Sequence, residues 1–549
     1  SVVGIAAGKT WSRIGPEVAP TASAASGVWL LNEYSENQGA GTWPNPPSGY
    51  YLMTTVYGNT TDQVCKSDVK TDPVTGKLHQ WRSGNPSAII STLNVIDSYK
   101  QLSDFDGSEA VNTTQGAAYG ASNWQDMATN GIYIRPSGAG AVYFGGGSTD
   151  ASSTLSGNLA GNSASFVQWA SNDGFTAGNE GIIYGASSNA NFSQDSRSQS
   201  GGVVDSSNNF YMQGETYPGK VESVLGKFSW SGTPWAASST VSLDWSLEFK
   251  ATSHVQMWGM RLCHGKIWSW GATNPFGVYY YGVAQAVTTA QGFNTPKYLT
   301  TNYSGTDSVY CNGVVEKAGT ANVYALITSM GVGGGGMWIA IAELDDACAV
   351  QSTIGLRLAT SNTRNQYEPS YPRLEIDSSG NFYVIVTTVQ AGVTSNRSLN
   401  IIKISPAGVK LWERSIFGTI GAGIRLQAAG ITIDDDDVLI INGITDPTTS
   451  YGKATAFLAR IPPNGGTDWS AQSAWTTSAG TYGLNYQTTN DWTIESGLTA
   501  ISTTGGTVAT SASGYTFATM AFGSGGSANV MNLEGAQSGN TMYGQETVG

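Results

Sequence analysis

Hydrophobic and polar residues alternate along most of the chain in short runs, and Gly, Asp, Asn and Ser separate these runs. This pattern is typical of β-strands joined by tight turns. In residues 401–412, alternating apolar positions flank a Pro-Ala-Gly turn and predict a hairpin that ends at Trp412. Only residues 25–38 suggest a short helix, which would stop at Gly39. The pattern therefore predicts an all-β fold.

The strand pattern repeats at a nearly constant interval. Each repeat has a polar turn, a strand with a large anchor residue and a second strand. The anchors recur every 56–59 residues and are Tyr211, Trp268, Tyr324, Tyr383 and Ile440. Two looser copies, each 68 residues outside this series, centre on Tyr143 and Val508 and bring the number of copies to seven. A constant period indicates one supersecondary unit that is stacked many times.

A unit of about 57 residues accommodates four short strands, and four-stranded blades around a central channel are the common arrangement at such periods. We therefore expect a seven-bladed β-propeller in residues 50–549 and a small irregular docking segment in residues 1–49. Residues 50–81 look blade-like but lack a first half, so they either complete the terminal blade or form an extra one. A β-solenoid is the alternative, although solenoid coils usually have shorter periods.

Composition excludes some classes of function. The net charge of −13 argues against a nucleic-acid partner, because phosphate contacts need clustered basic residues. No apolar run reaches the ~18 residues that span a bilayer, and the first residues lack the pattern of a secretory signal. We therefore expect no membrane insertion. Four widely spaced cysteines are expected to be buried thiols in a reducing compartment: Cys65, Cys263, Cys311 and Cys348.

Candidate catalytic residues are few. Glu343, Asp345 and Asp346 are possible carboxylates for glycoside hydrolysis, but a solvated loop explains them better. The four consecutive Asp residues at 434–437 lack the spacing of a calcium loop and occupy the turn position of a repeat. The chain has three histidines and no zinc-protease or serine-nucleophile motif. We expect no catalytic, cofactor or metal site.

Aromatic residues are abundant, with 17 Trp, 26 Tyr and 15 Phe. Exposed aromatic rings stack on sugars while polar neighbours form hydrogen bonds. Tyr279, Tyr280 and Tyr281 are the best candidates for such surface contacts with a glycan or receptor. Packing of these rings between strands is the alternative.

The first 49 residues suit a docking role. Pro-rich extended backbone is already ordered and loses less entropy on binding. Trp29, Trp43 and Pro44 are the candidate docking residues, because Trp is favoured at the energetic centres of interfaces. The alternative is that both tryptophans pack on the flank of their own chain.

A family resemblance lies in the same segment. It is carried by Ser26-Gly27-Val28-Trp29-Leu30-Leu31-Asn32-Glu33 and Gly41-Thr42-Trp43-Pro44. These two runs resemble a segment near the start of tailed-bacteriophage virion proteins, in which Ser-Gly-Val-Trp-x-Leu-x-Glu precedes Gly-x-Trp-Pro. The resemblance covers about 30 residues and brings no catalytic residues with it.

The resemblance implies a structural protein of the phage tail or tail fibre, made in the host cytoplasm and assembled into the virion with other virion proteins. Several copies around a symmetric tail would form a homo-oligomer. Attachment to a host-surface glycan or receptor is a further expectation. The alternatives are a carbohydrate-active propeller enzyme, such as a depolymerase or glycosidase, and a secreted lectin-like adhesin.

Overall fold

The structure is a computed structural model, and it describes the chain as a series of segments. They are residues 29–33, 64–65, 69–71, 78–80, 83–84, 95–96, 111–112, 125–134, 141–148, 163–170, 180–185, 190–192, 202–216, 222–234, 240–251, 254–274, 280–293, 296–303, 308–330, 337–358, 373–389, 397–418, 424–433, 436–447, 455–466, 475–477, 480–482, 484–503, 509–512, 517–519 and 546–548. These segments contain many β-strands and no helix, which confirms the all-β prediction for this part of the chain. No helix within them is long and apolar enough to cross a membrane.

Six antiparallel sheets follow one plan, in which consecutive strands pair in sequence order, except that β12 and β13 both pair with β14. Each is named here after the strand that carries the repeat anchor. The β9 sheet has β8 (Gln125–Ile134), β9 (Ala141–Ser148), β10 (Ser163–Ala170) and β11 (Glu180–Gly185). The β14 sheet has β12 (Ala190–Phe192), β13 (Gly202–Val204), β14 (Phe210–Thr216), β15 (Glu222–Ser231) and β16 (Thr240–Lys250). The β18 sheet has β17 (His254–Cys263), β18 (Lys266–Asn274), β19 (Tyr281–Thr288) and β20 (Lys297–Thr301).

The other three sheets of this plan come next along the chain. The β22 sheet has β21 (Ser308–Glu316), β22 (Val323–Met330), β23 (Trp338–Leu344) and β24 (Val350–Leu358). The β26 sheet has β25 (Arg373–Ile376), β26 (Phe382–Val389), β27 (Arg397–Ile404) and β28 (Lys410–Gly418). The β30 sheet has β29 (Ile424–Ile433), β30 (Leu439–Pro447), β31 (Thr455–Ile461) and, from the start of the chain, β1 (Trp29–Glu33).

Other described strands form smaller sheets. The β4 sheet joins β3 (Val69–Thr71) and β4 (Leu78–Gln80) to the C-terminal strand β39 (Glu546–Val548). Three two-stranded pairs are β2 (Val64–Cys65) with β5 (Ser83–Gly84), β6 (Val95–Ile96) with β7 (Val111–Asn112), and β32 (Trp475–Thr477) with β33 (Gly480–Tyr482).

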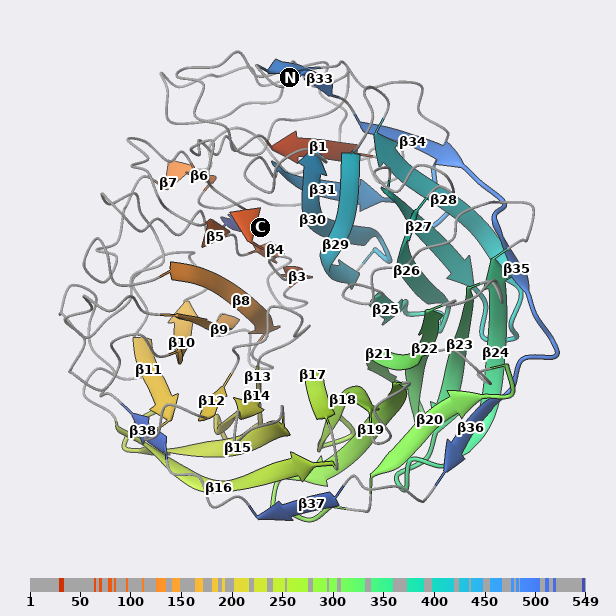
Figure 1. Cartoon of the computed structure of the whole chain (residues 1–549). Coiled ribbons are helices and arrows are strands. Elements are labelled where there is room, and N and C mark those ends of the chain that lie inside the picture. Colours follow the sequence, from red (N-terminus) through yellow and green to blue (C-terminus); the bar gives the residue numbers. More distant parts are fainter. Residues whose placement is uncertain are drawn as a thin grey trace.

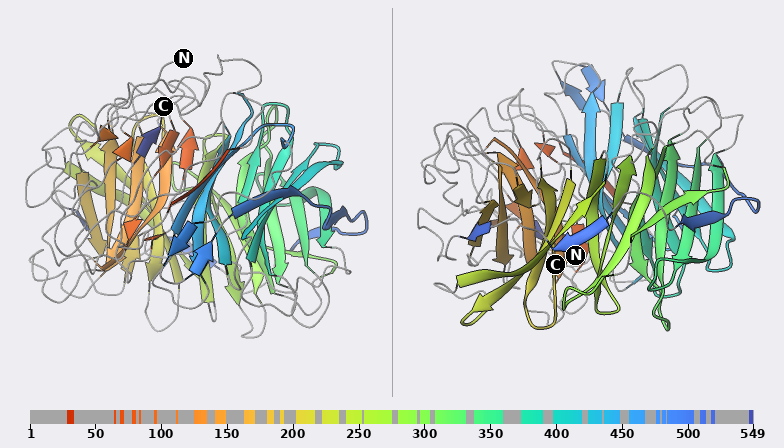
Figure 2. Two further views of the ribbon diagram at one scale, coloured as in Figure 1. Left: turned by 90° about the horizontal axis from the view of Figure 1, so that it is seen from above. Right: turned by 60° about the horizontal axis from the view of Figure 1, so that its bottom comes forward.

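The sheets stand around a common centre, with their strands side by side along one direction (Figures 1 and 2). The innermost strands are β3, β8, β13, β17, β21, β25 and β29 (Figure 1). Each contacts the next in this series, and β29 also contacts β3. Neighbouring sheets therefore meet along their inner edges.

Six of the predicted anchors lie in equivalent strands, each paired with the innermost strand of its sheet: Tyr143, Tyr211, Trp268, Tyr324, Tyr383 and Ile440. Val508, the anchor predicted for a last copy, lies outside the described residues. The strand that follows it, β37 (Ala509–Ala512), is the outermost strand of the β14 sheet and does not start a sheet of its own. This short strand pairs with the edge of β16.

The end of the chain adds an outer strand to one sheet after another, in reverse order. β34 (Leu484–Thr488) pairs with β28, β35 (Trp492–Ile494) with β24, and β36 (Ala500–Thr503) with β20. β37 then pairs with β16, β38 (Phe517–Thr519) with β11, and β39 with β4. We call β34 to β39 the C-terminal belt, whose first five strands lie on the outer rim in Figure 1.

The helix predicted over residues 25–38 is wrong at residues 29–33, the part of it that the structure describes. These residues form β1, a strand that pairs antiparallel with β31, from Trp29 opposite Arg460 to Glu33 opposite Ala456. A helix of this length is marginal on its own, so the hydrogen bonds offered by the edge of β31 decide the conformation. Residues 29–33 of the expected docking segment thus belong to the β30 sheet, while the domain boundary at residue 49 stays a prediction.

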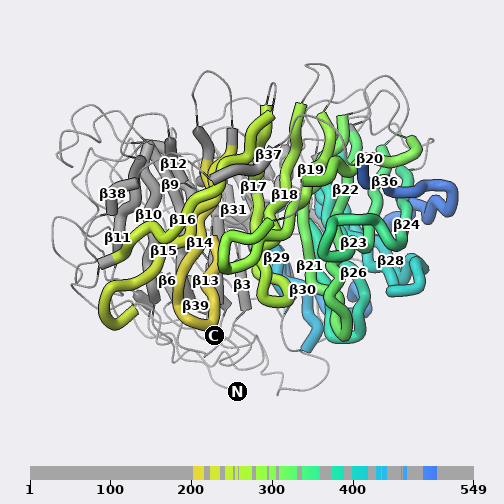
Figure 3. Tube along the Cα trace, turned by 90° about the horizontal axis from the view of Figure 1, so that it is seen from below, coloured from red at the N-terminus to blue at the C-terminus, as the bar shows by residue number. Residues whose placement is uncertain are grey.

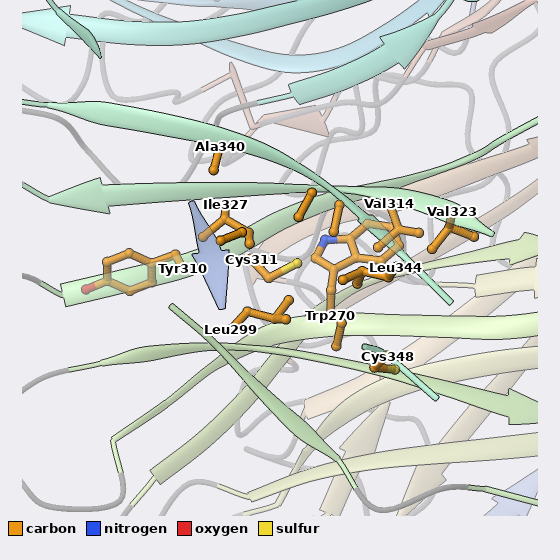
Figure 4. Close-up of a cluster of buried hydrophobic side chains, with 14 of the residues drawn as sticks. Trp270, Leu299, Tyr310, Cys311, Val314, Val323, Ile327, Ala340, Leu344 and Cys348 are labelled. Atoms are coloured by element: carbon orange, nitrogen blue, oxygen red, sulfur yellow. The ribbon is translucent and has the colours of Figure 1, made fainter. Parts of the chain in front are cut away.

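The hydrophobic core lies between neighbouring sheets. One cluster joins the β18 and β22 sheets, and Figure 4 shows part of it around Trp270, Leu299 and Cys311. Further clusters join the β14 and β18 sheets, the β22 and β26 sheets, and the β26 and β30 sheets. Each large side chain buried in this way contributes about 1.5–3 kcal/mol. In β18, every position after Lys266 is buried, so both faces of this strand pack in the core.

The first strand of four sheets bulges directly before a glycine. The pairing register shifts between Thr129 and Gly131 in β8, between Met257 and Gly259 in β17, between Cys311 and Gly313 in β21, and between Ala428 and Gly430 in β29. A bulge increases the local twist of a strand. The repeated bulge therefore bends the inner strands in a common way.

Two of these glycines give a matched test of packing. We expect Gly259→Ala to lower the free energy of unfolding by about 1–3 kcal/mol, because its methyl group would lie 2.2 Å from the buried Trp270 ring. Gly313→Ala is the control, since its nearest contact beyond its neighbours would be 3.5 Å, with Leu374. Denaturant midpoints measure both changes, and equal losses would contradict the packing explanation.

Candidate functional site

Most residues of the predicted docking surface lie outside the described part of the chain. Trp43 and Pro44 belong to segments that are not described, as does Tyr279 among the candidate glycan or receptor contacts. Trp29 lies in β1, and its backbone stands opposite Arg460. The docking role of Trp29, Trp43 and Pro44 stays a prediction.

Tyr280 and Tyr281 are half-buried and point to opposite sides of their sheet. The Tyr280 ring stacks on Tyr310, with 5.5 Å between ring centroids, and packs on the cluster between the β18 and β22 sheets. The Tyr281 ring lies 5.8 Å from that of Tyr298 and packs on the cluster between the β14 and β18 sheets. The two rings therefore do not form one continuous surface, and a glycan contact at either stays a prediction.

Glu343 is held by three side chains. Lys317 Nζ and Asn322 Nδ2 each donate to its Oε1 at 2.7 Å, and Ser352 Oγ donates to Oε2 at 3.0 Å. Burial acts to raise the pKa of Glu343, but these hydrogen bonds outweigh it and hold the pKa below its usual 4.5. A general acid at neutral pH needs a raised pKa, so this geometry favours a structural ion pair.

Asp345 and Asp346 also have structural partners. Asp345 Oδ1 accepts hydrogen bonds from the backbone N–H groups of Ala347 and Ala349, both at 2.9 Å. Asp346 forms an ion pair with Lys266 at 2.5 Å. The first contact closes the turn between β23 and β24, and the second links this turn to the β18 sheet.

The consecutive aspartates at 434–437 form a turn at their described end, as predicted. Asp437 adopts a positive φ of 59°. Its Oδ1 accepts the backbone N–H of Ser378 at 2.8 Å, and its Oδ2 accepts the Ser378 hydroxyl at 2.6 Å. This turn therefore ties the β30 sheet to the β26 sheet.

A buried ion pair lies beside that turn. Lys403 Nζ is 2.9 Å from Asp377 Oδ2, and both side chains are almost fully buried. Lys403 also donates to the carbonyl of Pro463 at 3.1 Å and lies 4.7 Å from the centroid of the Tyr383 ring. Burial acts to raise the pKa of Asp377, but hydrogen bonds from Asn381 and Lys403 outweigh it and hold the pKa below 3.8.

The most elaborate polar site surrounds the buried carboxylate of Glu413 in β28. Its Oε1 accepts the hydroxyl of Thr489 at 2.9 Å and the backbone N–H of Asp491 at 2.7 Å. Its Oε2 accepts the backbone N–H of Trp492 at 3.1 Å and Lys410 Nζ at 2.9 Å. We call this group the Glu413 clamp, because it fixes the chain where the belt passes from the β26 sheet to the β22 sheet.

Lys410 strengthens the same crossing. Besides Glu413, its ammonium group donates to Asn490 Oδ1 at 2.5 Å and to the backbone carbonyl of Trp492. A buried charge is stable only when it is paired and hydrogen-bonded. The clamp meets this requirement by using the backbone of the belt itself.

Three cysteines are free thiols in the core, as predicted: Cys263, Cys311 and Cys348. Burial raises the pKa of each thiol to about 12, which keeps them protonated and unreactive at neutral pH. Figure 4 places Cys311 and Cys348 in the cluster between the β18 and β22 sheets. Cys65 lies in β2, where the side chain is not described.

Within the described segments, no group of three or more His, Cys, Asp and Glu side chains is placed to hold a metal ion. Sequence reasoning missed the Glu413 clamp. Glu413 directly follows the hairpin predicted to end at Trp412, and its belt partners Thr489 and Trp492 lie 76 and 79 residues further along the chain. No protein-family model and no curated protein sequence matches this chain.

Proposed function

We propose that the chain is a structural component of a tailed-phage virion, a tail or tail-fibre protein that acts in assembly and in attachment to the host surface. The proposal rests on the resemblance of residues 26–44 to virion proteins and on the architecture. The architectural observation that carries it is the pairing of strands from both ends of the chain with sheets formed by its middle. Such a body suits a rigid building part.

The body that we propose is a seven-bladed β-propeller. Six blades would be the sheets that carry the repeat anchors, and the β4 sheet would belong to the seventh. The series of contacts among the inner strands, including the contact of β29 with β3, supports this arrangement. Pairing of β1 with β31 would then close the ring next to the seventh blade.

The polar groups of the described residues support a scaffold more than a reaction centre. The candidate carboxylates Glu343, Asp345 and Asp346 all hold turns or link sheets. The buried carboxylates Asp377 and Glu413 do the same at two other positions. Their hydrogen-bonding capacity is used within the protein.

Purified particles test the proposed function. We expect antibodies against the chain to decorate the tail in electron micrographs, and the chain to co-purify with tail proteins in a fixed ratio through a density gradient. Particles that lack the chain would overturn the proposal. Release of reducing sugar from host polysaccharide by the purified chain would instead support the enzyme alternative.

A further inference from the structure

The C-terminal belt runs along the outer side of boundaries between neighbouring sheets. The chain has already passed each of these boundaries once, when it formed the sheets. Going forward, the chain passes from the β18 sheet to the β22 and β26 sheets. Going back, β34, β35 and β36 pair with the outer edges of the β26, β22 and β18 sheets in turn. Figure 3 shows this returning segment as a blue tube on the outside of the molecule beside β24 and β28. Residues 484–503 therefore bridge two junctions between sheets.

Buried side chains of the same segment fill the outer ends of three inter-sheet clusters. Tyr486 belongs to the cluster between the β26 and β30 sheets, and its hydroxyl donates to Gly465 O at 2.7 Å. Trp492 belongs to the cluster between the β22 and β26 sheets. Leu498 and Ala500 belong to the cluster between the β18 and β22 sheets. Each junction thus contains an apolar group from the belt.

The turns between the belt strands are fixed as well. The first is held by the Glu413 clamp. The second, at residues 495–498, lies so close to β24 that a methyl group at Gly355 would be 2.5 Å from Glu495 O. Asn302 then donates to Gly497 O at 2.7 Å and accepts from the Thr499 backbone N–H at 2.9 Å. The segment is anchored at its turns and at its strands.

We propose that residues 484–503 act as a lock on the β18, β22 and β26 sheets, and that the Glu413 clamp controls its release. These sheets cannot separate at either junction until the segment has left, because it spans both. When the segment leaves, Trp492 becomes exposed and the carboxylate of Glu413 loses its two backbone N–H donors. The lock therefore sets the rate of unfolding, which is the property that protects an assembled part.

The test uses the full chain with a protease site inserted after residue 470, between β31 and β32. After cutting, the fragment from residue 471 onward is held by non-covalent contacts alone. Size-exclusion chromatography after timed incubation measures how fast the fragment leaves. We expect the cut wild-type protein to retain the fragment in buffer, and Glu413→Gln to release it about tenfold faster or more.

The control is Glu316→Gln, which changes a half-exposed carboxylate that accepts the backbone N–H of His264 at 3.0 Å and forms no hydrogen bond with the described belt residues, and it should leave the release rate unchanged. Thr489→Val removes one donor to Glu413 and decides the matter if Glu413→Gln does not fold. Faster release from Thr489→Val supports the lock. The proposal is overturned if the fragment elutes separately as soon as the wild-type chain is cut, or if neither clamp variant releases it faster than Glu316→Gln.

Discussion

Replacing Lys403 with Met is expected to lower the free energy of unfolding at pH 7 by about 3–5 kcal/mol, because it leaves the carboxylate of Asp377 buried without its cation. Met fills a similar volume but carries no charge. The variant also loses the hydrogen bond to Pro463 O and the contact with the Tyr383 ring. Denaturant unfolding, followed by Trp fluorescence, measures the change.

The pH dependence of the free energy of unfolding distinguishes the effect of the unpaired charge from the effect of the other lost contacts. In the wild-type protein the pKa of Asp377 is lower folded than unfolded, so its contribution to stability is present above pH 3.8 and is lost as the pH falls through the folded pKa. In the variant, burial without Lys403 raises the pKa of Asp377, and acid neutralises the unpaired group. The difference in stability between the two proteins should therefore shrink from pH 7 to pH 3.

A double variant tests the same explanation in a second way. Adding Asp377→Asn to Lys403→Met removes the uncompensated charge while an amide oxygen remains to accept the turn hydrogen bonds from Ser379 and Asn381. The double variant should regain part of the lost stability at pH 7. A difference that stays constant from pH 3 to pH 7, with no recovery in the double variant, would show that the lost packing dominates.

Sequence periodicity located most sheets because their second strands carry local signals. The turns at Asp205 and Asp377 illustrate this: each carboxylate accepts backbone N–H groups two and four residues further on. An Asp with this spacing before an aromatic strand is visible in the chain without any distant partner. The glycines after the bulges, such as Gly259 and Gly313, are a second local signal, because each marks the first strand of a sheet.

The belt could not be predicted in this way, because distant partners determine its strands. Leu358 stands opposite Trp492, and Tyr298 stands opposite Thr503. The sequence of β36, Ala-Ile-Ser-Thr, is too short and too polar to indicate which sheet it joins. The helix prediction at residues 25–38 was wrong for the same reason, since the edge of β31 determines the conformation of β1. The Glu413 clamp depends on contacts with the belt, so the sequence pattern does not predict it either.

Trp492 gives the largest expected effect within the belt. It is fully buried between the β22 and β26 sheets, whereas Ile494, two residues further along the same strand, is 39% exposed. We expect Trp492→Ala to lower the free energy of unfolding by about 3–5 kcal/mol, because it opens a cavity where two sheets meet. Ile494→Ala is the matched control and should change it by less than about 0.5 kcal/mol.

The two variants also test whether the belt unfolds together with the sheets. If it does, Trp492→Ala lowers the denaturant midpoint of the whole transition and leaves its slope unchanged. If the belt detaches first, the variant instead produces an early, separate transition, and fluorescence and circular dichroism no longer coincide. The first result is expected, because Trp492 packs in one cluster with Leu356 of β24 and Phe382 of β26. Loss of this side chain therefore weakens both sheets as well as the strand that carries it.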